Sequence, residues 1–84
     1  MSRFYLHLRD HVDQVLDPEG REFADMAAVI KAVRAGALDT LANELKRGGI
    51  IDLRYRIDAE NDAGEIVYTL PFADAVTILA NDAS

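Results

Sequence analysis

The spacing of hydrophobic residues changes along this 84-residue chain, and this change restricts the possible folds more than any other feature. Residues 3–9 alternate between polar and apolar side chains, which is the period of a half-buried strand. From Asp25 onward, apolar residues recur at steps of three and four, as they do along one face of a helix. Alternation returns over residues 53–60. The chain is therefore predicted to combine an antiparallel sheet with one long helix.

The predicted helix has clear boundaries. Its apolar stripe consists of Met26, Val29, Ile30, Val33, Ala37, Leu41 and Leu45. Asp25 is a plausible N-cap, Lys46 and Arg47 suit the negative end of the helix dipole, and residues 48–49, both glycine, can end a helix in the left-handed conformation. Gly36 lies in the helix interior, where glycine costs about 1 kcal/mol relative to alanine. Either another element packs closely there or the helix bends.

Shorter elements complete the pattern. Residues 15–16 predict a short second strand, followed by a turn at residues 17–20, where Pro18 presets φ and Gly20 closes the turn. Residues 53–60 and 65–70 predict a hairpin around a loop at residues 61–64, and Pro71 ends the second strand.

The spacing of Phe72, Ala75, Val76 and Leu79 predicts a short second helix, with fraying over residues 81–84. The expected fold is α+β in the order ββαββα: a sheet of three to four strands with one long helix on one face and a short C-terminal helix. The order of the strands within the sheet stays open.

Size and charge limit the class of protein. A chain of this length is expected to form one domain over residues 1–84. Fifteen acidic and nine basic residues give a net charge of −6, which opposes non-specific binding to nucleic acid and to anionic membranes. The absence of cysteine excludes disulfides and thiolate chemistry and favours a reducing compartment. No apolar run is long enough for a membrane span, so we expect a cytoplasmic protein.

No catalytic or metal-binding pattern emerges. His7, Asp10, His11 and Asp13 are suitable ligand types for a metal, but alternation places His7 in a strand and His11 in the following loop, where their side chains have unrelated directions. The acidic loop lacks the spacing of a calcium site, and nucleophile and phosphate-loop motifs are missing. We therefore expect no enzyme activity, no metal, no cofactor and no small-molecule substrate.

The most suggestive pattern is a candidate binding face. Its six members are Arg3, Tyr5, His7, Arg9, Arg54 and Arg56. The first four share one face of the first strand, and the last two share the outward face of the strand after the long helix. If these strands are neighbours, the face is basic and aromatic and could contact nucleic acid. Alternatively, the arginines pair with Asp58, Glu60 or Glu65 across strands, and the face is merely solvated.

Three separated motifs resemble a small bacterial family of domains of unknown function. They are residues 3–10 (RFYLHLRD), residues 17–20 (DPEG) and residues 70–75 (LPFADA). The family is similar in its RYFFHLRDG-type strand, its acidic turn, its Ala- and Leu-rich helix and its LPFxDA box. This resemblance implies a fold but no activity. His11 stands where the family tends to have glycine, and Gly36 interrupts a helix that is usually richer in alanine and leucine.

Two kinds of function follow from these features. The first is a small protein-interaction or regulatory module that uses the candidate face or a free edge strand. Its partner is either a second copy of itself, which gives a homodimer, or another protein. A variant of it rests on the start of the chain, which resembles HicB-type antitoxins, whose partner is a basic toxin. The alternative is a nucleic-acid-binding domain that uses the arginine, tyrosine and histidine face. The sequence leaves the partner, the process and the oligomeric state open.

Overall fold

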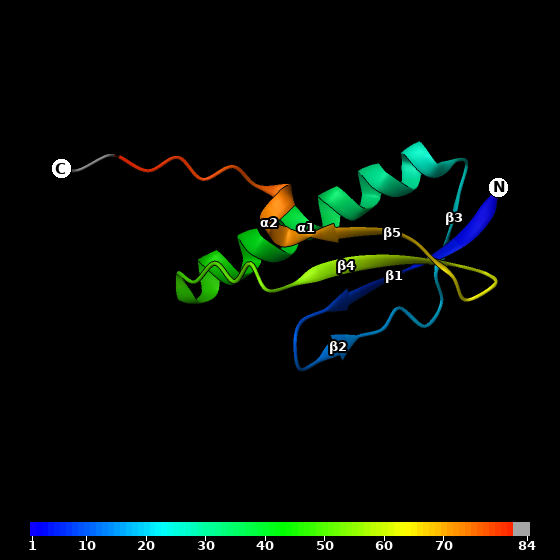
Figure 1. Ribbon diagram of the computed structural model, residues 1–84, viewed down its shortest axis with the longest axis horizontal. Coiled ribbons are helices and arrows are strands. Elements are labelled where there is room, and N and C mark those ends of the chain that lie inside the picture. Colours follow the sequence, from blue (N-terminus) through cyan, green and yellow to red (C-terminus); the bar gives the residue numbers. More distant parts are fainter. Residues whose placement is uncertain (82–84) are drawn as a thin grey trace.

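Within residues 1–81, which the computed structural model describes, five strands form one antiparallel sheet and a long helix crosses one of its faces (Figure 1). The elements in chain order are β1 (Ser2–Arg9), β2 (Gln14–Val15), β3 (Arg21–Phe23), α1 (Met26–Gly48), β4 (Arg56–Asn61), β5 (Ile66–Pro71) and α2 (Phe72–Ala75). The prediction of an α+β fold with one long and one short helix is confirmed.

The sheet has the strand order β2-β1-β4-β5, and β3 pairs with the other half of β1, beside β2. The structure thus answers the question that the sequence left open, because β1 and β4 are neighbours. Their antiparallel register places His7 opposite Asp58 and Arg9 opposite Arg56. Since β5 has β4 as its one strand neighbour among the described residues, β5 forms an edge of the sheet.

The boundaries of α1 agree with the predicted signals. The Asp25 carboxylate accepts a hydrogen bond from the Ala28 N–H at 2.8 Å, which caps the helix start. At the other end, Gly49 has a φ of 67° and donates its N–H to the Leu45 carbonyl at 2.8 Å. An alanine Cβ at position 36 would lie 3.5 Å from Cδ1 of Ile57, an ordinary van der Waals distance.

The hydrophobic core lies between α1 and the sheet. The helix buries Val29, Val33, Ala37 and Leu41, and the sheet contributes Ile57, Ala59 and Leu70. α2 closes the core by burying Phe72, whose ring lies against that of Tyr55 with 5.5 Å between centroids. Both described helices lie on this side, so the opposite face of the sheet, called the outer face below, has no helix from residues 1–81 over it (Figure 1).

Several strands differ from the expectations, and β5 runs over Ile66–Pro71 instead of residues 65–70, so that Pro71 lies inside the strand. The strand β3 was not predicted, because its residues Arg21–Phe23 are too few to show a period. The second strand is Gln14–Val15 rather than residues 15–16. β4 begins at Arg56 instead of residue 53, because the Asp52 carboxylate accepts hydrogen bonds from the Arg54 N–H and guanidinium and so forms a local turn there.

The second helix is shorter than predicted. α2 ends at Ala75, and Val76 is already extended, with φ −129° and ψ 154°. The β-branched residues Val76, Thr77 and Ile78 have weak helix propensity, which explains the early end. Of the predicted fraying segment, residues 82–84 lie outside the described residues. No helix in the described part of the chain combines the length and the apolarity needed to cross a bilayer.

Candidate functional site

Five of the six predicted face residues share the outer face of the sheet. Arg3, Tyr5, His7 and Arg9 alternate along β1, and Arg56 lies directly opposite Arg9 on β4. The sixth residue, Arg54, does not join them, because it lies in the turn before β4. Its guanidinium is bound to Asp52 at 3.0 Å.

Asp58 organises the centre of the outer face. This side chain is almost fully buried, with 4% of the residue exposed. Its carboxylate accepts hydrogen bonds from the Thr69 hydroxyl at 2.7 Å, from Arg9 at 2.7 Å and from Arg56 at 3.3 Å. Burial alone would raise the pKa of Asp58, but the hydrogen bonds from Thr69 and Arg9 and the charge of Arg56 outweigh it and lower the pKa. The ionised carboxylate therefore holds two arginines that would otherwise repel each other.

His7 connects the outer face to the loop between β2 and β3. Nδ1 of the imidazole lies 3.1 Å from the backbone nitrogen of Asp17, and Nε2 lies 3.1 Å from a carboxylate oxygen of Glu60. Because a backbone N–H can only donate, Nδ1 must accept, and the proton of the neutral ring is on Nε2. Both ring nitrogens are thus used in holding the fold together.

The DPEG turn is attached to β1 by a side chain. Burial raises the pKa of Asp17, but hydrogen bonds from the N–H groups of Gly20, Leu6 and Glu19 outweigh this effect and lower it. The bond from Leu6 falls between the two parts of β1 that pair with β2 and β3. The acidic turn therefore has a structural role.

The basic groups of the outer face are paired with acids. Arg9 and Arg56 share Asp58, His7 contacts Glu60, and Arg3 contacts Glu22 at 3.4 Å. Pairing of arginines with Asp58 was part of one of the two alternatives that the sequence left open, whereas Glu60 contacts His7 and not an arginine. Glu65, the third acid of that alternative, instead accepts a hydrogen bond from Asn61. The face therefore presents compensated charges rather than a row of free arginines.

A second surface is the free edge formed by β5. Its six residues, IVYTLP, include no charged side chain, and Ile66 and Val67 are 46% and 41% exposed. The opposite edge consists of the short strands β2 and β3, and β3 contains Arg21 and Glu22. Natural sheets usually protect a long edge with charges or a bulge, because its unpaired N–H and C=O groups can bind another strand. Only the β2–β3 edge has the charges, whereas the β5 edge has a register shift in its pairing with β4, between Ala59 and Glu60.

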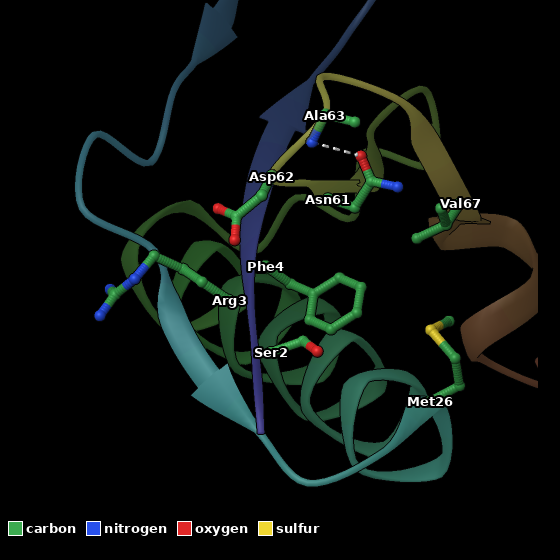
Figure 2. A pocket seen from close by; sticks show the side chains of 8 residues that line it. All are labelled: Ser2, Arg3, Phe4, Met26, Asn61, Asp62, Ala63 and Val67. Atoms are coloured by element: carbon green, nitrogen blue, oxygen red, sulfur yellow. Dashed lines mark hydrogen bonds between the residues drawn. The ribbon is translucent and has the colours of Figure 1, made fainter.

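A hollow of about 520 Å³ opens beside the start of β5, on the helix side of the sheet. Figure 2 shows Phe4 at its centre, with Met26 of α1 and Val67 of β5 beside it. Ser2, Asn61 and Asp62 form its polar rim, and the Asn61 side chain is held by the Ala63 N–H at 3.0 Å. The hollow therefore offers apolar contact next to the free strand.

A free edge strand was expected from the sequence, but its position was not. A partial signal was present, since the strand predicted over residues 65–70 contains one charged residue, Glu65, at its start, whereas the longer predicted strands contain several. The hollow had no such signal, because it joins residues from three distant segments. Within residues 1–81, no three His, Asp or Glu side chains are grouped so as to hold a metal ion.

The fold and its surfaces define a small two-layer α+β domain with an internally paired polar face and an uncharged sheet edge. The chain belongs to a family described as a domain of unknown function (DUF6894), whose model matches residues 3–73. This match extends from the first strand into the LPFADA motif. No curated protein and no solved structure matches the chain.

Proposed function

We propose that this domain is a protein-interaction module that self-associates through the free edge of β5. The observation that carries this proposal is the contrast between the two edges of one sheet, since the longer edge strand, β5, is uncharged and includes the exposed residues Ile66 and Val67. Strand addition to such an edge obtains its affinity from main-chain hydrogen bonds and its specificity from pockets for alternate side chains.

Charge supports the choice of this edge over the rest of the surface. Each copy has a net charge of −6, so two copies repel each other at most orientations. An uncharged strand lets them approach where this repulsion is weakest. The outer face is less suited to a partner, because its arginines are already bound to Asp58 and Glu22. The same pairing weakens the case for nucleic-acid binding, which uses arginines that are free to contact phosphate.

Sedimentation velocity over a range of concentrations tests this proposal. The wild-type chain is expected to increase in mean mass with concentration, and Val67→Lys is expected to weaken association about tenfold or more, because it places a charge beside the pairing edge. The matched control is Val12→Lys. Val12 is 79% exposed but lies in the loop between β1 and β2, so this substitution should leave association unchanged.

Two results would count against the proposal. A wild-type chain that stays monomeric at every concentration would exclude self-association as its function. Equal weakening by Val67→Lys and Val12→Lys would show that added charge, and not the β5 edge, is responsible. Repeating the measurement with added RNA or DNA separates the nucleic-acid alternative, which predicts co-sedimentation that is lost in Arg56→Glu.

A further inference from the structure

The segment after α2 is extended and, after Val76, exposed. Residues 76–81, called the tail below, are outside helices and strands, and Figure 1 shows them leaving α2 and pointing away from the sheet. Ile78 is 62% exposed and Leu79 is 90% exposed. The Cα radius of gyration is 14.3 Å, whereas a compact chain of this length is expected to have about 12 Å. Both α1 and the tail extend beyond the sheet in Figure 1, in keeping with this larger radius.

The tail has the composition of a strand without a neighbour. Its sequence, VTILAN, has no charged residue, and three of its six residues are β-branched. Val76 already has strand dihedral angles. The first part of the tail borders an apolar groove of about 240 Å³ formed with Leu41, Leu45 and Ile51, but this contact does not cover Leu79. An exposed apolar segment in an extended conformation is suited to strand addition.

The β5 edge has the matching properties. It is a strand without an outer neighbour among the described residues, it is also uncharged, and the hollow with Phe4, Met26 and Val67 lies beside its start. A strand that pairs with β5 directs every second side chain to the helix side of the sheet. An isoleucine or leucine of that strand can then enter the hollow shown in Figure 2.

We propose that the tail of one copy adds to the β5 edge of a second copy as an extra strand. This inference rests on the proposed self-association and names the segment that binds the edge. The tail does not reach the edge of its own β5, because α2 separates the two and the tail runs on beyond the end of β5 (Figure 1). The contact joins two different surfaces, the tail of one copy and the β5 edge of another. Two copies can therefore exchange tails reciprocally, or many copies can join tail to edge in an open chain.

Complementation between two variants tests this contact. Val67→Lys places a charge at the edge and leaves the tail intact. Leu79→Pro removes a backbone N–H from the tail and leaves the edge intact. Each variant alone is expected to associate at least about tenfold more weakly than the wild type, whereas an equimolar mixture forms a 1:1 complex through the one intact edge and the one intact tail. Leu79→Val, which keeps an apolar strand former, is the control and should associate like the wild type.

The outcomes separate the inference from the proposed function. If Leu79→Pro associates like the wild type while Val67→Lys does not, the edge binds something other than the tail, such as a second β5. The inference is then overturned and the proposed function stands. If the wild type itself is monomeric, both fail. If both variants are monomeric and their mixture shows no complex, the direct contact between tail and edge is excluded.

A distance measurement provides an independent check. The chain contains no cysteine, so single cysteines can be introduced at positions 67 and 79 and labelled with spin probes. In a mixture of the two labelled chains, a short distance between the position 67 label of one copy and the position 79 label of the other is expected. A short distance only between two position 67 labels would instead indicate pairing of β5 with β5 and would contradict the inference.

Discussion

Asp58 is the residue on which the outer face depends. Arg9 and Arg56 lie opposite each other on neighbouring strands, where like charges destabilise a sheet, and Asp58 contacts both. We expect Asp58→Asn to lower the free energy of unfolding by about 1–3 kcal/mol, because the amide cannot compensate two guanidinium groups. Urea unfolding measures this change. Asp39→Asn on the exposed side of α1 is the control and should stay within about 0.5 kcal/mol of the wild type.

The lowered pKa of Asp58 also predicts a pH dependence. A carboxyl group whose pKa is lower in the folded state stabilises the fold above its ordinary pKa of 3.8 and loses this effect as the pH falls through the folded value. The free energy of unfolding should therefore decrease as the pH is lowered below about 4. Urea unfolding at several pH values should show a smaller decrease for Asp58→Asn. An equal decrease in both chains would contradict this role of Asp58.

His7 allows a prediction about a single proton. Since the Asp17 N–H donates to Nδ1, the neutral His7 ring should exist as the Nε2–H tautomer alone. The ¹⁵N chemical shifts of the two ring nitrogens report the tautomer. His11 is exposed in the loop after β1, and its Nε2 lies 3.5 Å from the Arg54 guanidinium, which can only donate. Neutral His11 should therefore favour the opposite Nδ1–H tautomer, which makes it an internal contrast. A protonated Nδ1 in neutral His7 would show that the loop contact is absent in solution.

At the scale of elements, two glycines should respond to alanine with opposite signs. Gly36 is inside α1, and an added Cβ would meet Ile57 only at an ordinary distance. Gly36→Ala should therefore stabilise the fold by up to about 1 kcal/mol, because alanine has the higher helix propensity. Gly20 has a φ of 69°, and an added Cβ would lie 2.8 Å from the Phe4 carbonyl oxygen. Gly20→Ala should destabilise by about 1–3 kcal/mol.

Thermal or urea unfolding of both glycine variants checks this contrast. A loss of stability in Gly36→Ala would mean that α1 packs more tightly on β4 than the 3.5 Å distance indicates. A neutral Gly20→Ala would mean that the turn before β3 can relax away from β1. Both substitutions leave the β5 edge and the tail unchanged, so neither should alter self-association.

At the scale of the whole molecule, the net charge predicts the effect of salt. Two copies with a charge of −6 repel each other, and salt screens this repulsion within a Debye length of about 10 Å at 0.1 M ionic strength. Self-association should therefore become stronger between about 50 mM and 500 mM sodium chloride. Sedimentation velocity at several salt concentrations measures it. Binding to nucleic acid would show the opposite dependence, since salt competes for phosphate contacts.

The local elements of this protein follow from its sequence. The start and end of α1 were predictable because Asp25 and Gly49 act within one turn of the chain. β1 and the β4–β5 hairpin follow from alternation and a short loop. Prediction was less successful where few residues carried the signal, as in β3, or where a side chain redirected the backbone, as Asp52 does before β4.

Only the tertiary structure decided which surfaces are available. The alternating period was enough to place the five outer-face residues on strands. Whether their charged groups are free or paired was decided by the pairing of β1 with β4, because this pairing brings Asp58 and Glu60 beside them. The β5 edge and its hollow depended on the strand order and on the position of α1. The physical reason is range: caps, turns and periods involve near neighbours in the chain, whereas strand order and charge pairing are set by the burial of one shared core.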